Sequence, residues 1–123
     1  MSEKIQSFKD LKAWQEARRL AVRIYQITKK FPPEEIYGMT SQMRRCAISI
    51  ASNIAEGFSR RHVKEKIRFF TTAAGSLTEL YNQLILSYDI GYILEGLYTE
   101  LEAQIIVEHR ILNGLITATR KWK

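Results

Sequence analysis

A basic run at residues 59–68, with the sequence SRRHVKEKIR, holds the side chains best suited to bind a ligand. Its cationic members are Arg60, Arg61, Lys64, Lys66 and Arg68 and its acid is Glu65, for a local net charge of +4. The pattern predicts a turn and then the first turns of a helix, where free backbone N–H groups and the helix dipole attract phosphate. Cations are unfavourable there without an anion, so the run indicates an anionic ligand. A solvated charged turn is the alternative that the sequence leaves open.

Two smaller basic groups could extend this surface. One comprises Lys12, Arg19 and Arg23, and the other comprises Arg120, Lys121 and Lys123, whose charges near the C-terminus are expected to be solvated. If phosphates bind, we expect contacts to the nucleic-acid backbone with little sequence preference. Aromatic side chains could stack on bases where they are exposed. The candidates are Trp14, Trp122, Tyr92 and Tyr98, of which Trp14 is expected in the core.

The charge balance suits an anionic partner but does not select one. Lys and Arg total 19 against 13 Asp and Glu, so the formal net charge is +6 and the pI is about 9.6. Nucleic acid is the commonest partner of such a chain. Many basic proteins nevertheless bind no anion specifically. The 123 residues, 46% of them hydrophobic, fit one domain at 1–123 with a single core.

No motif in the sequence predicts catalysis. His62 and His109 fall on different predicted helices and lack metal-ligand spacing to another His, Cys or acid. Cys46 lies on an apolar stripe, where a free cysteine acts as a small hydrophobe. A di-iron bundle needs Glu-x-x-His pairs, and none occurs. We expect no catalytic residue, no metal and no cofactor, and therefore a non-enzymatic protein.

The same composition suggests a cytoplasmic location. A single cysteine cannot form an internal disulfide. The first residues lack the apolar segment of a signal peptide, and no apolar run approaches the ~20 residues that span a bilayer.

Apolar residues spaced three and four apart predict the helices that must position these side chains. The expected helices cover about residues 8–31, 39–57, 62–90 and 95–120. Short breaks make successive helices antiparallel neighbours, so the expected fold is an all-α, up-down-up-down four-helix bundle. Ser7 with Asp10 imitates a capping box before the first helix. Gly57 is expected to end the second helix in a left-handed conformation, as Gly91 ends the third.

The second helix, SQMRRCAISIASNIAEG at residues 41–57, is apolar except for a few groups. Its conspicuous polar residues are Arg44, Arg45, Asn53 and Glu56. The two arginines point about 100° apart, so we expect one to face a carboxylate such as Glu79 and the other to face solvent or a channel. We expect these groups to fix register and subunit contacts. A direct ligand role and catalysis are the alternatives.

Two further expectations concern this helix and the one after it. A carboxylate near a helix C-terminus is disfavoured by the dipole, so Glu56 is expected to pair with Arg60 or Arg61 nearby. Gly75 with Ser76, in the middle of the third helix, is expected to permit close helix approach.

The second and fourth predicted helices carry more apolar residues than the core of a monomer needs. The additional residues are Ile48, Ala51 and Ala55 on one, and Ile106, Val107 and Ile111 on the other. Either the core is generous or a second face is buried between subunits.

Several motifs together resemble a known family over about residues 7–120. The motifs are Trp14-Gln15, Phe31-Pro32, Tyr37-Gly38 before Thr40-Ser41-Gln42, Arg44-Arg45, the SNIAEG at 52–57, Gly75-Ser76 and Gly91-Tyr92. They resemble the four-helix bundle proteins of 23S rRNA intervening sequences. Departures from that pattern include Ala51 in place of a frequent proline, His62 in place of a frequent serine cap, and Leu94 in place of a cap residue.

The resemblance implies a bacterial bundle without known enzymatic activity that assembles as a ring-like homopentamer with a central channel. It also implies kinship with accessory proteins of diversity-generating retroelements, which bind nucleic acid and a reverse transcriptase. The expected function is therefore non-enzymatic binding of RNA or DNA through phosphate contacts, by a homo-oligomer. The alternative is a protein–protein adaptor for an enzyme such as a reverse transcriptase.

Overall fold

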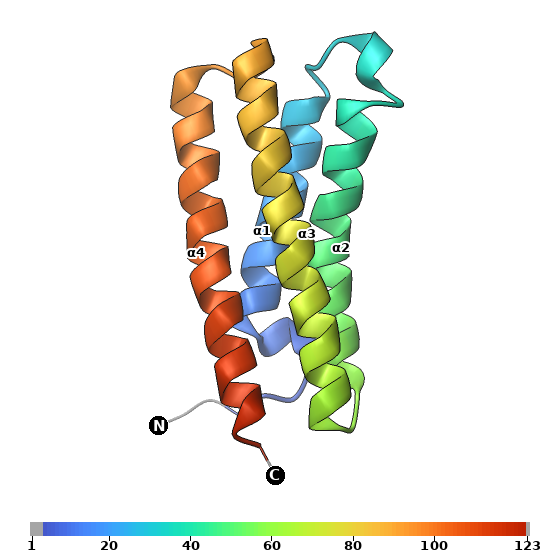
Figure 1. The fold of residues 1–123 in the computed structure, drawn as a ribbon, viewed down its shortest axis with the longest axis vertical. Helices are drawn as coiled ribbons and strands as arrows, with labels where there is room; N and C mark the ends of the chain where they lie inside the picture. The colour runs from blue at the N-terminus through green and yellow to red at the C-terminus, as the bar shows by residue number, and fades with distance from the viewer. Residues whose placement is uncertain (1–3, 123) are drawn as a thin grey trace.

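The computed structural model describes residues 4–122 and confirms the all-α prediction. Its helices are α1 (Lys12–Thr28), α2 (Met39–Ser59), α3 (Val63–Ile90) and α4 (Glu95–Arg120), with short 3-10 turns η1 (Phe8–Asp10) and η2 (Pro33–Glu35) (Figure 1). Within the described residues no strand occurs. None of these helices is both long and apolar enough to cross a membrane.

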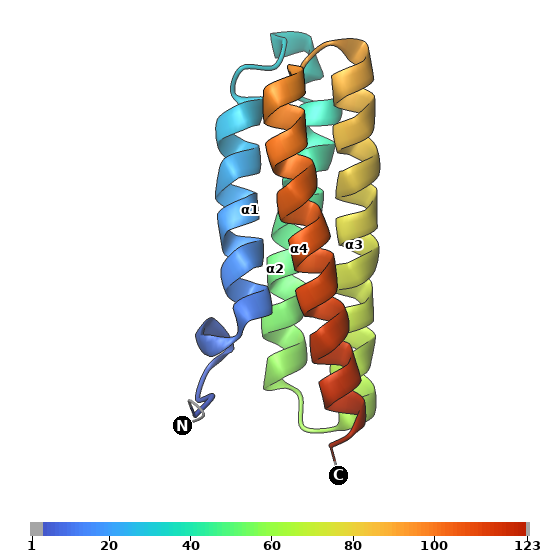
Figure 2. The ribbon, with the colours of Figure 1, turned by 90° about the vertical axis from the view of Figure 1, so that its left-hand side faces the viewer.

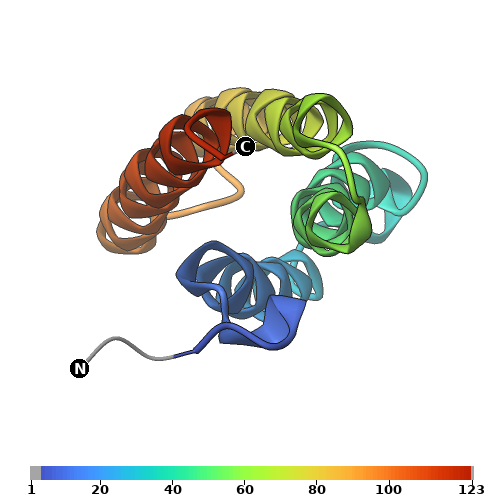
Figure 3. The same ribbon diagram turned by 90° about the horizontal axis from the view of Figure 1, so that it is seen from below.

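Successive helices run antiparallel and lie side by side around the bundle (Figures 1 and 2). Seen along the bundle in Figure 3, the helices follow the order α1, α2, α3, α4 around its axis. The first and last helices, α1 and α4, are therefore also neighbours and contact each other. The α2–α3 turn lies at the same end as the start of α1 and the end of α4. The α1–α2 and α3–α4 connections lie at the opposite end.

The core forms where the predicted apolar stripes of the four helices meet. Its largest fully buried side chains are Leu20, Ile24, Met43, Ile50, Ile54, Phe70, Leu77, Leu80, Leu84, Leu101, Ile105 and Leu112. Cys46 is buried among them as a free thiol. Burying one such side chain contributes about 1.5–3 kcal/mol, so the stripes account for the association of the helices.

The first predicted helix is interrupted near its beginning. Ser7 Oγ accepts from the Lys9 N–H at 3.1 Å and Asp10 Oδ2 accepts from the Ser7 N–H at 3.1 Å, but the helix that they cap is η1. Leu11 then adopts an extended conformation, and α1 begins at Lys12. His62 and Leu94 precede α3 and α4 without side-chain capping bonds, as expected.

The predictions for Gly57, near the end of α2, and for Gly75, in the middle of α3, were wrong. Gly57 does not end α2 in a left-handed conformation, because the helix continues to Ser59 and Gly91 is the glycine with positive φ. A Cβ on Gly57 would lie 2.6 Å from Cε1 of Phe70, so this glycine allows α3 to approach α2. A Cβ on Gly75 would meet no atom within 4 Å, so Gly75 permits no such approach.

Candidate nucleic-acid interface

Charge is strongly segregated along the length of the bundle. The half that contains the α2–α3 turn, residues 4–19, 50–75 and 109–122, carries thirteen Lys and Arg against four Asp and Glu. The other half, residues 20–49 and 76–108, carries five Lys and Arg against eight Asp and Glu. The formal charges are therefore +9 and −3. We call these halves the basic end and the acidic end.

Two of the predicted phosphate-binding residues have their charged groups engaged within the α2–α3 turn. Arg60 Nη2 donates to Glu56 Oε2 at 2.8 Å, which confirms the pairing expected for Glu56. The Arg60 guanidinium also lies 4.8 Å from the centroid of the Phe69 ring. Lys66 is buried, and its Nζ donates to the carbonyl of Phe58 at 2.7 Å. Burial lowers the pKa of Lys66. The carbonyl of Phe58 offsets part of this burial by accepting a hydrogen bond from the ammonium.

Three other cations of the basic run are exposed and have their charges available to a ligand. Arg61, Lys64 and Arg68 lie in the turn and on the outer side of the first turns of α3. Lys64 and Arg68 line a shallow hollow together with Glu65 and Ile67. The basic run therefore divides into residues that hold the turn and residues that can receive phosphate.

The start of α1 supplies a second basic hollow at the same end. Lys9, Trp14, Gln15, Arg18 and Arg19 line a polar hollow of about 460 Å³. The Arg18 guanidinium lies 5.6 Å from the Trp14 ring centroid, while Arg19 pairs with Glu16 one turn earlier.

Lys9 and Arg18 were not among the predicted phosphate-binding residues, because the candidates on the first helix were chosen along one face of that helix. Residues 4–19 contain five cations, and this clustering was the signal that could have found them. Lys12 is exposed at the first position of α1, also at the basic end.

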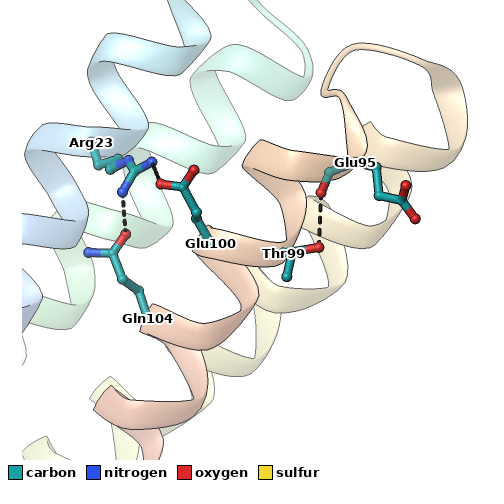
Figure 4. A network of polar contacts seen from close by, with 5 residues as sticks. All are labelled: Arg23, Glu95, Thr99, Glu100 and Gln104. Carbon is teal, nitrogen blue, oxygen red and sulfur yellow. Dashed lines mark hydrogen bonds and ion pairs between the residues drawn. The ribbon is translucent and has the colours of Figure 1, made fainter.

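Arg23, a further candidate, belongs to the acidic end and ties α1 to α4. Its Nη2 donates to Glu100 Oε1 at 2.6 Å and its Nη1 to Gln104 Oε1 at 3.3 Å (Figure 4). Thr99, the residue before Glu100, donates from its Oγ1 to the Glu95 carbonyl one turn earlier in α4 (Figure 4). Arg23 thus joins two helices and lies apart from the basic run.

Of the two adjacent arginines of α2, one contacts a neighbouring helix and the other is exposed. Arg44 Nε donates to Thr28 Oγ1 at 2.9 Å, and its guanidinium lies 4.6 Å from the Tyr25 ring centroid. Arg45 is exposed. Over residues 4–122, neither arginine pairs with Glu79, which instead accepts from Cys46 Sγ at 3.6 Å.

A small hydroxyl cluster joins α2 to α3 beside these residues. Asn53 Nδ2 donates to the Ser49 carbonyl at 2.8 Å, and the hydroxyls of Ser49 and Ser76 lie 2.8 Å apart. The Ser49–Ser76 contact links α2 to α3, whereas the Asn53 bond lies within α2. The expected subunit contacts of Arg44, Arg45, Asn53, Glu56 and Glu79 stay predictions.

Ionisable groups elsewhere form no metal-binding cluster in the part of the chain that the structure describes. His109 Nδ1 lies 3.2 Å from the Asn113 amide on the same exposed surface of α4. Glu108 is fully buried, and burial together with the charge of Glu16 raises its pKa to about 9.

Comparisons with known proteins agree with this architecture. Residues 9–114 match the model of a family described as 23S rRNA-intervening sequence protein. The fold is similar to the crystal structure, at 1.70 Å resolution, of a protein of unknown function from the S23 ribosomal protein family of Bacteroides thetaiotaomicron VPI-5482. The TM-score is 0.79 at 23% identity, over 85% of this chain and 95% of that one. No curated protein matches the sequence. The family match extends over most of the bundle, and the chain therefore belongs to the 23S rRNA-intervening sequence protein family.

Proposed function

We propose that this protein is a non-enzymatic, cytoplasmic bundle that binds RNA or DNA by contacting phosphates with its basic end. The observation that carries the proposal is the segregation of charge, +9 at one end against −3 at the other. A polyanion is attracted to a surface of concentrated positive charge and releases its counterions on binding. A protein whose +6 were spread evenly would offer no such surface.

Three segments that are distant in sequence contribute exposed cations to this end. They are η1 and the start of α1 with Lys9, Lys12 and Arg18, the α2–α3 turn and the start of α3 with Arg61, Lys64 and Arg68, and the end of α4 with Arg120 and Lys121. Exposed lysine and arginine side chains contact the phosphate backbone of a nucleic acid, and such contacts discriminate little between base sequences. We therefore expect weak sequence preference and strong salt dependence.

Association of several copies would strengthen such binding. Large apolar side chains that remain exposed on α2, α3 and α4 are Ile48, Ile85, Leu86, Ile90, Ile106 and Val107. They support the burial of a second face between subunits, and the family resemblance favours a ring of five. Repetition of the basic end in a ring would raise avidity without new contacts.

The test is charge reversal at the basic end with a matched control at the acidic end. The triple variant R61E/K64E/R68E changes the net charge by the same amount as the control K29E/K30E/R45E, whose three side chains are also exposed. Affinity for a 20-base-pair DNA and for RNA is measured by fluorescence anisotropy from 50 to 300 mM salt.

We expect the basic-end variant to lose at least about tenfold in affinity, and the slope of log K against log salt to become shallower by about three for the duplex. The control should lose much less. Equal losses in the two variants, or binding by the wild type that is insensitive to salt, would contradict the proposal.

A further inference from the structure

Trp122 is a large aromatic residue that remains exposed at the basic end. Its side chain follows the last turn of α4, and 61% of the residue is exposed. The backbone is nevertheless fixed, because the Trp122 N–H donates to the Thr119 carbonyl at 3.0 Å. The function proposed above is the binding of phosphates by cations, and it does not require an exposed indole ring.

The indole ring is positioned by a buried cation. Lys66 Nζ lies 5.3 Å from the Trp122 ring centroid and 5.4 Å from the Phe58 ring centroid. Lys66 is itself anchored, because Nζ donates to the Phe58 carbonyl and the residue is only 7% exposed. A cation near an aromatic face attracts the ring. The ring is therefore held at the end of the bundle while most of its surface stays in contact with solvent.

The surroundings of the ring are cationic. Arg120 and Lys121 directly precede it and are both exposed, and residues 109–122 contain no acid. Proteins that bind single-stranded nucleic acid combine such cationic surfaces with aromatic rings on which bases stack. The bases of a duplex already stack on one another, so a duplex offers mainly its phosphates to this end.

We propose that Trp122 is a stacking platform for an unpaired base, so that the basic end binds single-stranded RNA or DNA in preference to duplex. This inference rests on the proposed function, because the phosphates of the same strand must reach the surrounding cations. It adds a class of ligand that charge alone does not select.

The second tryptophan provides an internal comparison. Trp14 is partly buried against the core, the Phe8 ring lies edge-on at 5.1 Å, and Arg18 lies 5.6 Å from the Trp14 ring centroid. The sequence contains only these two tryptophans. A Trp14→Phe variant therefore reports fluorescence from Trp122 alone, and Trp122→Phe reports from Trp14 alone.

The experiment compares three polyanions with the full-length protein: a 20-nucleotide oligothymidylate, a 20-base-pair duplex, and inorganic polyphosphate, which has no bases. We expect Trp122→Ala to lose about tenfold in affinity for oligothymidylate. Its affinity for duplex and polyphosphate should change less than twofold. Trp122→Phe, which keeps an aromatic ring, should recover most of the loss. Oligothymidylate should quench the fluorescence of the Trp14→Phe variant, whereas polyphosphate should not.

Each outcome decides between the two proposals. If Trp122→Ala lowers the affinity for all three ligands equally, or for none of them, the stacking inference is overturned. Salt-dependent binding by the basic end then still stands. If the wild type binds none of the three ligands in a salt-dependent manner, the proposed function fails and the inference fails with it. Thermal unfolding of Trp122→Ala and Trp122→Phe separates a loss of stacking from a loss of fold.

Discussion

The carboxyl group of Glu108 has no polar partner although it lies in the core. The residue is fully buried, and within the described residues neither side-chain oxygen forms a hydrogen bond. Burial is the main cause that raises its pKa to about 9, and the charge of Glu16 on α1 adds to it. The folded protein therefore keeps this carboxyl protonated at neutral pH, at a cost in stability relative to the unfolded chain.

We predict that this carboxyl makes the protein less stable as pH rises. Its pKa is about 4.5 when unperturbed and about 9 in the folded protein, so between these values the folded state binds one proton more. The contribution of Glu108 to the free energy of unfolding should then fall by up to about 1.4 kcal/mol per pH unit. Below pH 4.5 both states are protonated and the penalty vanishes.

Urea unfolding from pH 5 to pH 9 measures this dependence in the wild type and in Glu108→Gln, which imitates the protonated acid. The difference in stability between the two proteins should grow with pH, and Glu34→Gln, an exposed control, should leave the slope unchanged. Parallel profiles for wild type and Glu108→Gln would show that Glu108 ionises normally.

At the scale of elements, α2 and α3 lie close together at Gly57, where a Cβ would lie 2.6 Å from Cε1 of Phe70. Phe70, whose ring lies against Gly57, is only 2% exposed, so a shift of the ring would disturb the packing around it. The helices α2 and α3 can lie this close because residue 57 has no Cβ atom.

We predict that Gly57→Ala destabilises the bundle by about 1–3 kcal/mol, because overpacking outweighs the gain in helix propensity. Gly75→Ala is the matched control. It is an exposed α3 position where a Cβ meets nothing within 4 Å, so it should gain about 0.5–1 kcal/mol. Chemical denaturation of both variants checks the signs, and a neutral Gly57→Ala would mean that Phe70 relaxes freely.

The helices and their order were predictable because apolar spacing of three and four is a local property of the chain. The third and fourth helices were placed almost to the residue. The roles of Gly57 and Gly75 were not predictable, since they depend on which residue of another helix lies opposite. The same reason explains why Lys66 was expected at the surface, although Phe58 and Trp122 surround its ammonium.

At the scale of the whole molecule, the segregation of charge arises from antiparallel order. Each helix end that is rich in cations reaches the same end of the bundle because the chain reverses direction three times. The net charge of +6 could be read from the sequence. The difference between the ends became clear only once the helices were placed.

We predict that the exposed apolar residues of α4 bury a subunit contact. The wild type should elute with a mass of several times the 14.3 kDa chain, five times for a ring of five. The double variant I106D/V107D should shift toward the mass of one chain in light scattering after gel filtration. Leu94→Asp, at a residue that is 82% exposed beside the start of α4, is the control and should retain the wild-type mass. A wild type of 14.3 kDa at micromolar concentration would refute the contact.

The start of α1 and the end of α4 both lie at the end of the bundle that holds the α2–α3 turn (Figure 1). An affinity tag or a fused protein attached at either terminus would therefore be joined at the end of the bundle that carries the exposed cations. A polyhistidine tag could shield this surface or add charge of its own to it. Binding measurements are best made after tag removal, or with a label introduced at the α3–α4 connection on the far side of the molecule.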